Sequence, residues 1–106
     1  MVACQDIRGL SDGIAKEYRP ERIVLFGYYA GGTPRDGSDV DVLVVMGHDG
    51  YALRKAAEIV QRFDTPFAVD LIIHTPEELR RRLAWNDRSL RGILDTGQVL
   101  FAAADH

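Results

Sequence analysis

The sequence has little that would support disulfide, metal–thiolate or membrane chemistry. Among its 106 residues there is one cysteine, Cys4, which cannot form an internal disulfide or join a second thiol in a redox or zinc motif. No apolar run approaches the roughly 18 residues of a membrane helix, and the first residues do not combine a basic segment with an apolar stretch. We therefore expect a cytoplasmic protein without a membrane span.

The chain also lacks the excess of basic residues that is typical of nucleic-acid-binding proteins. It has 13 Lys and Arg against 16 Asp and Glu, a net charge of −3, and the two signs are interspersed. Binding to a polyanion would therefore have to be local or depend on metal ions. The length predicts a single domain, residues 1–106, with a modest core.

Hydrophobic periodicity predicts four helices and four strands, in the order helix–strand–strand–helix–strand–helix–helix–strand. Helices are expected at 5–18 and 50–63, from Thr75 through Arg82, and around Leu90 to a stop at Gly97; strands are expected at 22–27, 39–46, 67–74 and 98–102. This order favours an α+β (α/β two-layer) fold, in which helices pack on one face of a small mixed β-sheet.

Two aspartates lie where the second of these strands begins, in "SDVDVLVV". Asp39 and Asp41 are two residues apart, so they point to the same face of a strand, with Cα atoms roughly 6.5 Å apart. A carboxylate pair at the edge of an apolar core costs free energy, because the charges repel each other and lose hydration. A divalent cation would offset that cost.

A third aspartate, Asp70, interrupts the apolar strand "FAVDLIIH". If the two strands are neighbours, three carboxylates meet, and such oxygen ligands favour magnesium or manganese over zinc. In a two-ion site Asp39 and Asp41 would bridge both ions, while Asp70 would lie beside the attacking oxygen and take its proton. The alternative for the pair is a turn that caps the strand start; for Asp70 it is a carboxylate on a sheet edge.

The loop before the aspartates is rich in glycine. Gly27 ends a strand and would let backbone N–H groups approach a phosphate, and Ser38 offers a hydroxyl next to Asp39. The loop is not a P-loop, because no Gly-Lys-Ser/Thr follows it.

Together these residues resemble the minimal nucleotidyltransferase (MNT) family of the polymerase-beta nucleotidyltransferase superfamily. The usual pattern of that family is a Gly-Ser pair, ten residues and Asp-x-Asp; here Gly27 and Tyr28 are followed by residues 29–38 and then Asp39-Val40-Asp41. The resemblance extends over nearly the whole chain. It implies a polymerase-beta-like fold and catalysis by Asp39, Asp41 and Asp70 as ligands of two Mg²⁺ ions, with Mn²⁺ as a substitute. It also implies that Gly27, Tyr28 and Ser38 line the nucleotide site.

The function that this resemblance implies is a protein-adenylyltransferase type of reaction. A nucleoside monophosphate, AMP, would pass from ATP to a hydroxyl group of a protein or an RNA. Such short proteins are commonly the antitoxin of a pair whose other member is a HEPN-type toxin, so the resemblance implies that partner as well. A homo-oligomer is left open.

Two positions depart from the family pattern. Tyr28 replaces the serine that helps to hold the triphosphate, and Gly31 stands where an arginine is usual. Each lost contact would weaken nucleotide binding by roughly ten- to a hundredfold. The alternative function is therefore a catalytically impaired antitoxin that acts by covering its partner, or a nucleotide-binding regulatory domain.

Overall fold

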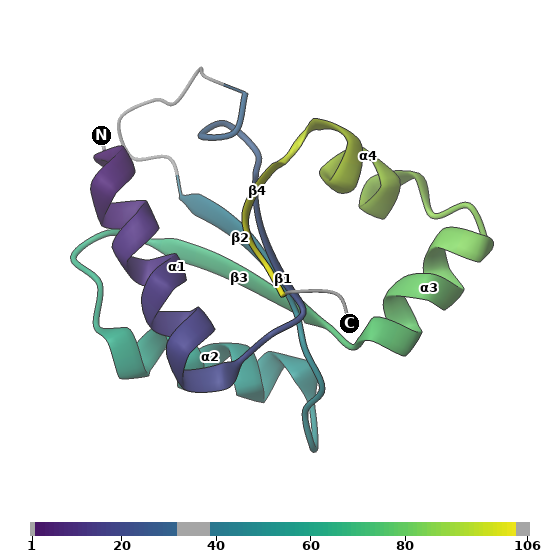
Figure 1. The fold of residues 1–106 in the computed structure, drawn as a ribbon, viewed down its shortest axis with the longest axis horizontal. Helices are drawn as coiled ribbons and strands as arrows, with labels where there is room; N and C mark the ends of the chain where they lie inside the picture. Colours follow the sequence, from purple (N-terminus) through teal and green to yellow (C-terminus); the bar gives the residue numbers. More distant parts are fainter. Residues whose placement is uncertain (1, 32–38, 104–106) are drawn as a thin grey trace.

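The computed structural model describes residues 2–31 and 39–103, and each expected helix and strand is present (Figure 1). The elements in chain order are α1 (Cys4–Tyr18), β1 (Arg22–Phe26), β2 (Val40–Val45), α2 (Ala52–Phe63), β3 (Val69–His74), α3 (Pro76–Ala84), α4 (Arg88–Thr96) and β4 (Gln98–Ala102). The described part of the chain contains no helix that is long and apolar enough to span a bilayer.

The four strands form one mixed sheet in the order β3-β2-β1-β4. β1 is antiparallel to both β2 and β4, whereas β2 and β3 are parallel. Parallel neighbours need a crossover connection, and α2 provides it between β2 and β3. The mixed sheet that we expected is therefore confirmed.

The helices cover both faces of the sheet, which corrects our expectation that they pack on one face. α1 and α2 cover one face, and α3 and α4 lie on the other (Figure 1). The reason lies in the central strand β2, whose residues are apolar without interruption from Val42 to Val45 and buried at every one of these positions. A strand of this kind needs cover on both sides, so the domain has three layers rather than two.

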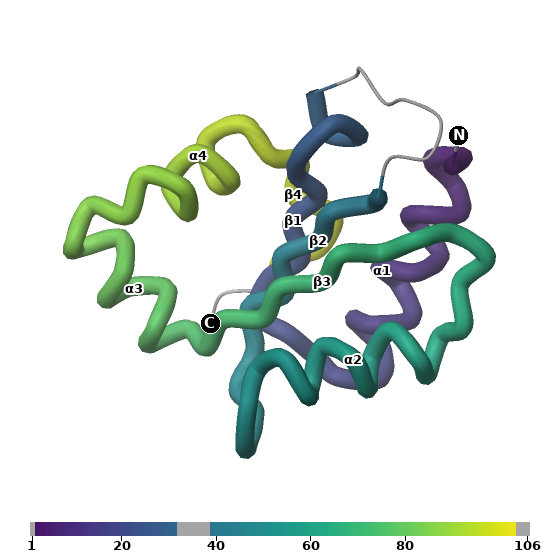
Figure 2. The backbone as a smooth tube through the Cα atoms, turned by 180° about the vertical axis from the view of Figure 1, so that it is seen from behind, coloured from purple at the N-terminus to yellow at the C-terminus, as the bar shows by residue number. Residues whose placement is uncertain are grey.

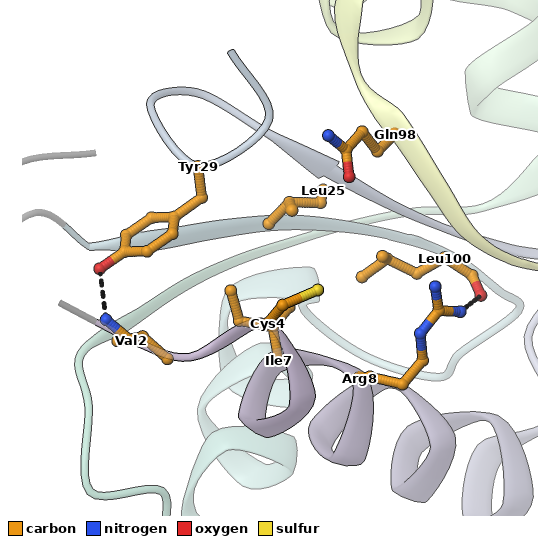
Figure 3. A pocket seen from close by; sticks show the side chains of 8 residues that line it. All are labelled: Val2, Cys4, Ile7, Arg8, Leu25, Tyr29, Gln98 and Leu100. Carbon is orange, nitrogen blue, oxygen red and sulfur yellow. Dashed lines mark hydrogen bonds between the residues drawn. The ribbon is translucent and has the colours of Figure 1, made fainter. Parts of the chain in front are cut away.

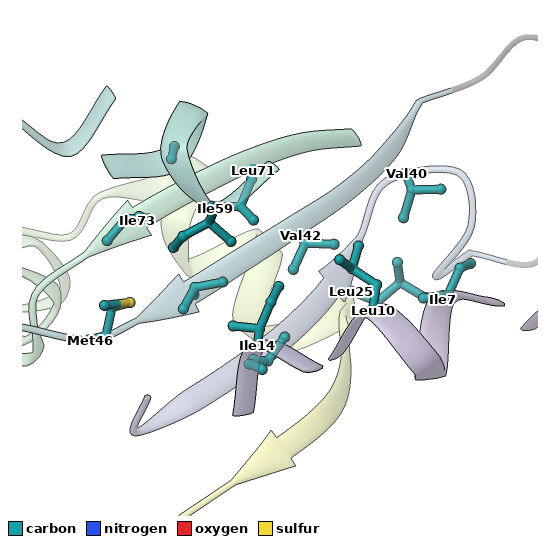
Figure 4. Close-up of a cluster of buried hydrophobic side chains, with 13 residues drawn as sticks. Ile7, Leu10, Ile14, Leu25, Val40, Val42, Met46, Ile59, Leu71 and Ile73 are labelled. Atoms are coloured by element: carbon teal, nitrogen blue, oxygen red, sulfur yellow. The ribbon is translucent and has the colours of Figure 1, made fainter. Parts of the chain in front are cut away.

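The larger core lies between the sheet and the helices α1 and α2. Ile14 of α1 and Ile59 of α2 are fully buried there against Val42 of β2 (Figure 4). Because side chains alternate along a strand, this packing fixes the even-numbered residues of β2 toward α1 and α2. The odd-numbered residues, Asp41 among them, consequently face the other side.

The second core covers only part of that other side. Leu79 of α3 and Leu90 of α4 pack against Leu43 and Val45 of β2. Asp41 lies on the same face as these two residues, closer to the start of the strand, and remains partly exposed. The smaller helical layer thus leaves the aspartate end of β2 open to solvent.

The direction of α3 is fixed where it leaves β3. The Thr75 hydroxyl accepts a hydrogen bond from the Glu78 backbone N–H at 3.1 Å, and Pro76 occupies the first turn. These are the residues that favour a helix start. The Glu78 carboxylate does not complete a capping box; it contacts His74 Nδ1 at 3.0 Å and accepts from Arg82 Nε at 3.1 Å. The end of β3 and the first two turns of α3 are therefore tied together.

Candidate functional site

The parallel pairing of β2 with β3 brings Asp41 and Asp70 together. The two residues are register partners, between the pairs Val40–Val69 and Val42–Leu71. Register partners on adjacent parallel strands point to the same face, so the two carboxyl groups lie close enough for Asp70 to raise the pKa of Asp41. The sequence-based condition for a carboxylate cluster, that these strands are neighbours, is thus met.

This arrangement raises the pKa of Asp41 above its ordinary value. Burial is the largest cause, followed by the negative charges of Asp70 and Asp39 and by the hydrogen bond with Asp70. All of these effects disfavour the ionised form of Asp41. The negative charge of Asp39 therefore helps to raise the pKa of Asp41.

Gly27 provides the space in which the Asp41 carboxylate lies. It follows β1 directly and has a φ of +75°, a conformation that side-chain-bearing residues rarely adopt. A Cβ atom at this position would overlap Asp41 Oδ2. The Gly27 carbonyl also accepts a hydrogen bond from the Gly31 N–H at 3.1 Å, which closes the turn. Sequence reasoning identified this glycine but not its contact with Asp41.

The turn after Gly27 carries the two tyrosines. Tyr28 is half exposed, at 51%. The Tyr29 hydroxyl accepts a hydrogen bond from the Val2 N–H at 3.0 Å, beside a cavity of about 180 Å³ between α1, β1 and β4 (Figure 3). Across that cavity's rim, Gln98 Nε2 donates to the Ala30 carbonyl at 3.3 Å. Tyr29 and Gln98 thus hold the turn from two sides, which no sequence signal indicated.

Ser38 lies outside the described residues. The assignment of Gly27, Tyr28 and Ser38 to the nucleotide site stays a prediction, as do the metal-binding roles of the three aspartates.

The carboxylates fit a hard divalent cation in part. Within residues 2–31 and 39–103, no three Asp, Glu, His or Cys side chains are arranged so that they could hold a metal ion. Asp41 and Asp70 are in contact, whereas Asp39 acts on Asp41 through its charge. Oxygen donors that repel one another are the ligands that Mg²⁺ and Mn²⁺ would stabilise, so the donor chemistry fits. Asp41 and Asp70, two of the three expected ligands, are neighbours already, and the Asp39 carboxylate would have to join them.

Comparison with known proteins adds a family match and three informative relatives. Residues 7–99 match the family described as nucleotidyltransferase domain. A "putative protein adenylyltransferase" of Methanocaldococcus jannaschii is 26% identical over 98 residues, which cover 90% of this chain and 94% of that protein.

Two solved structures are similar to this fold. The crystal structure of a "putative nucleotidyltransferase" from Sulfolobus solfataricus has a TM-score of 0.56 and 26% identity, over 73% of this chain and 70% of that one. A structure described as a toxin-antitoxin with AMP-PNP has a TM-score of 0.57 and 21% identity, over 91% and 73% of the two chains. These likenesses confirm the small mixed α/β fold that the sequence favoured.

A substitution at Gly27 tests whether this residue makes room for Asp41. Gly50 has the same φ of +75°, but a Cβ added there would meet no other atom, so Gly50→Ala reports backbone strain alone. We expect Gly50→Ala to lower the free energy of unfolding by about 1 to 2 kcal/mol. Gly27→Ala should cost about 1 to 3 kcal/mol more, because of the overlap with the carboxylate. Urea denaturation measures both.

Repeating both substitutions in an Asp41→Ala background isolates the contact between position 27 and the Asp41 carboxylate. In this background Gly27→Ala and Gly50→Ala should lower the free energy of unfolding by about the same amount, because the overlapping carboxylate is gone. An excess cost of Gly27→Ala that persists without the Asp41 carboxylate would contradict the contact.

Neutralising Asp41 should stabilise the metal-free protein near pH 7. Because the pKa of Asp41 is raised on folding, the native state binds more protons than the unfolded state between the ordinary and the raised values. The stability contributed by this group is therefore present at low pH and lost as the pH rises through that window. Asp41→Asn removes the charge, so its melting temperature should exceed that of the wild type at pH 7 and approach it in acid.

Asp12→Asn, on the exposed face of α1, serves as the control and should melt like the wild type. Addition of Mg²⁺ should raise the melting temperature of the wild type more than that of Asp41→Asn. If Asp41→Asn is less stable than the wild type at pH 7 without metal, the charge of Asp41 does not destabilise the fold and the prediction is wrong.

Proposed function

Because the chain belongs to the nucleotidyltransferase domain family, we propose that it transfers AMP from ATP to a hydroxyl group of a protein. The observation that carries this proposal is the Asp41–Asp70 carboxylate pair, held in register beside Gly27. The name of the Methanocaldococcus jannaschii relative, a protein adenylyltransferase, supports both the adenine nucleotide and the protein acceptor.

Asp39, Asp41 and Asp70 divide the work of the proposed reaction. The acceptor oxygen attacks the α-phosphorus of ATP, the bond to the β-phosphate oxygen breaks, and pyrophosphate leaves. Asp70 is exposed at this site and takes the proton of the acceptor hydroxyl. Asp39 and Asp41, together with Asp70, would hold the two ions. Two Mg²⁺ ions, when bound, would supply the positive charge that neutralises the triphosphate and the leaving group.

The turn after Gly27 faces the same end of the sheet and would receive the triphosphate. Gly27 has a positive φ and carries no side chain, which would allow a phosphate to approach the backbone of this turn. We assign Gly27, Tyr28 and Ser38 to the nucleotide site on the family pattern.

We further propose that the acceptor is a toxin of the HEPN type and that this chain is its antitoxin. The similarity to the fold of a toxin-antitoxin structure that contains AMP-PNP supports a nucleotide and a toxin as partners. The HEPN identity rests on the family resemblance. Transfer to an RNA hydroxyl is the competing outcome.

A second candidate function is an antitoxin that binds its partner without modifying it. Tyr28 and Gly31 favour this candidate, because the family holds the triphosphate with a serine and an arginine at these places. The lack of a three-donor metal arrangement in the described part of the chain favours it as well.

Transfer of label from α-labelled ATP distinguishes the two candidates. We expect the purified chain, with Mg²⁺, to label the product of the neighbouring gene. Asp41→Asn should lower the rate about a hundredfold or more, because a lost metal ligand removes several kcal/mol of transition-state stabilisation. Asp12→Asn should retain the wild-type rate.

Partner binding in the absence of labelling would establish the non-catalytic antitoxin and reject the transfer reaction. Label on RNA instead of protein would reject the protein acceptor. An unchanged rate in Asp41→Asn would reject the catalytic role of that residue.

Tyr28→Ser restores the residue that the family uses at this position. If the tyrosine merely replaces a phosphate-binding hydroxyl, the variant should bind ATP about tenfold more tightly, as measured by titration calorimetry. Tyr51→Ser, which removes a 78% exposed tyrosine at the start of α2, should leave ATP binding unchanged. Weaker ATP binding by Tyr28→Ser would instead show that the tyrosine side chain itself contributes to ATP binding.

A further inference from the structure

An apolar groove lies along the outer side of β3 and reaches Asp70. It has a volume of about 340 Å³ and is lined by α2 side chains between positions 53 and 61 and by Val69, Asp70 and Leu71 of β3. Figure 2 shows β3 at the outside of the sheet with α2 alongside it. Leu53, at one end of the groove, is 83% exposed. A large apolar side chain with this exposure, beside other apolar groups, is typical of a contact surface.

The backbone of β3 has hydrogen-bonding groups directed toward this groove. The Ala68 carbonyl accepts a hydrogen bond from the Val40 N–H of β2 at 2.9 Å, and the His74 carbonyl accepts one from the N–H of Met46, the residue after β2, at 3.0 Å. In a parallel pair only every second residue of a strand bonds to the neighbouring strand, and the alternate residues direct their N–H and C=O groups away from it. Val69, Leu71 and Ile73 therefore direct theirs toward the outer edge, where no strand of the described chain pairs with them.

The opposite edge of the sheet is protected in ways that β3 is not. The pairing of β4 with β1 contains a register shift between Ile23 and Val24, and Arg8 of α1 donates to the Leu100 carbonyl at 3.2 Å. Irregular pairing and a cationic side chain are features that block further strand addition. The pairing of β3 with β2 is regular from Val69 to His74. Of the two sheet edges, the one beside the groove is the more suitable for an added strand.

The groove matches a short extended segment in length. Eight residue steps along α2, from Leu53 to Gln61, span about 12 Å. An extended chain covers this distance with about four residues. Because α2 leads from the end of β2 back to the start of β3, its Gln61 end lies near Val69 and Asp70.

We propose that this groove binds an extended segment of the acceptor protein, which pairs with β3 as a fifth strand and presents its hydroxyl side chain to Asp70. Asp70 belongs both to the groove and to the carboxylate pair, so the groove is continuous with the candidate active site. Successive side chains of an added strand point to opposite faces. Apolar residues would point toward α2, and the hydroxyl-bearing residue between them would lie on the face of Asp70. The proposal rests on the proposed function, in which Asp70 receives the hydroxyl proton.

Leu53→Glu tests the groove without disturbing the core, since this side chain is exposed. Val99→Glu is the matched control, because Val99 is an exposed apolar residue, at 57%, on the opposite edge strand β4. The probe is the product of the neighbouring gene. We expect Leu53→Glu to raise its dissociation constant and its KM about tenfold or more, and Val99→Glu to change them less than twofold. Both variants should bind ATP like the wild type.

Hydrogen exchange tests strand addition directly. In the complex, exchange at the amides of Val69, Leu71 and Ile73 should slow at least tenfold relative to the free chain. The amides of β4 should keep their free-chain rates. Protection on β4, or none on β3, would overturn the fifth-strand arrangement.

Binding and labelling together separate this inference from the proposed function. A partner that binds the wild type, loses affinity for Leu53→Glu and is never labelled supports the groove and rejects the transfer reaction. Labelling at equal rates by the wild type and Leu53→Glu supports transfer and overturns the groove. A wild-type dimer in sedimentation that Leu53→Glu dissociates would show that a second copy occupies the groove. The absence of both binding and labelling overturns both proposals.

Discussion

Two carboxyl groups held in register across a parallel strand pair, those of Asp41 and Asp70, set requirements that the rest of the domain meets. Parallel pairing of β2 with β3 needs a crossover helix, and α2 supplies it on the face opposite the aspartates. That face can be entirely apolar, as Val42 and Val44 show. The face that carries Asp41 cannot be entirely apolar, and α3 and α4 cover it from Leu43 onward. The repulsion between the two carboxylates lowers the stability of the fold locally, and the burial of apolar side chains in the two cores offsets this loss.

The antiparallel neighbour β1 meets a different requirement, that of space. The Asp41 carboxylate lies against the end of β1, at a place where any side chain would collide with it. Gly27 therefore serves two purposes at once: it turns the chain away from the sheet and leaves room for the carboxylate. Tyr29 and Gln98 then fix the turn to the N-terminus and to β4. A loop held on both sides can keep its backbone donors in place for a ligand at low entropic cost.

The sequence was sufficient to predict the helices and strands of this fold and to single out Gly27, Asp41 and Asp70, which the structure brings close together. Helical and strand periodicities differ, and Thr75 with Pro76 marks a helix start by local chemistry, so these features need no tertiary information. The proximity of Asp41 and Asp70 could be predicted only on the assumption that their strands are neighbours, because the order of strands in a sheet depends on contacts between distant parts of the sequence. The uninterrupted apolar run of β2 is typical of a strand that is covered on both faces, whereas the element order alone does not distinguish one covered face from two. The overlap at Gly27 and the groove beside β3 depend on packing between distant segments, which no local pattern reveals.

The order of the strands also suits the different roles that we propose for the two aspartates. β2 is flanked by strands on both sides, and Asp41 is partly buried at its start. β3 is an edge strand, so Asp70 is exposed and a large acceptor can approach it from the side. A proton acceptor for a macromolecular substrate has to be accessible to that substrate, whereas a carboxylate that would hold an ion beside the triphosphate has to lie close to the turn after Gly27. Placing one carboxylate on a central strand and its register partner on the neighbouring edge strand satisfies both demands within a single pair.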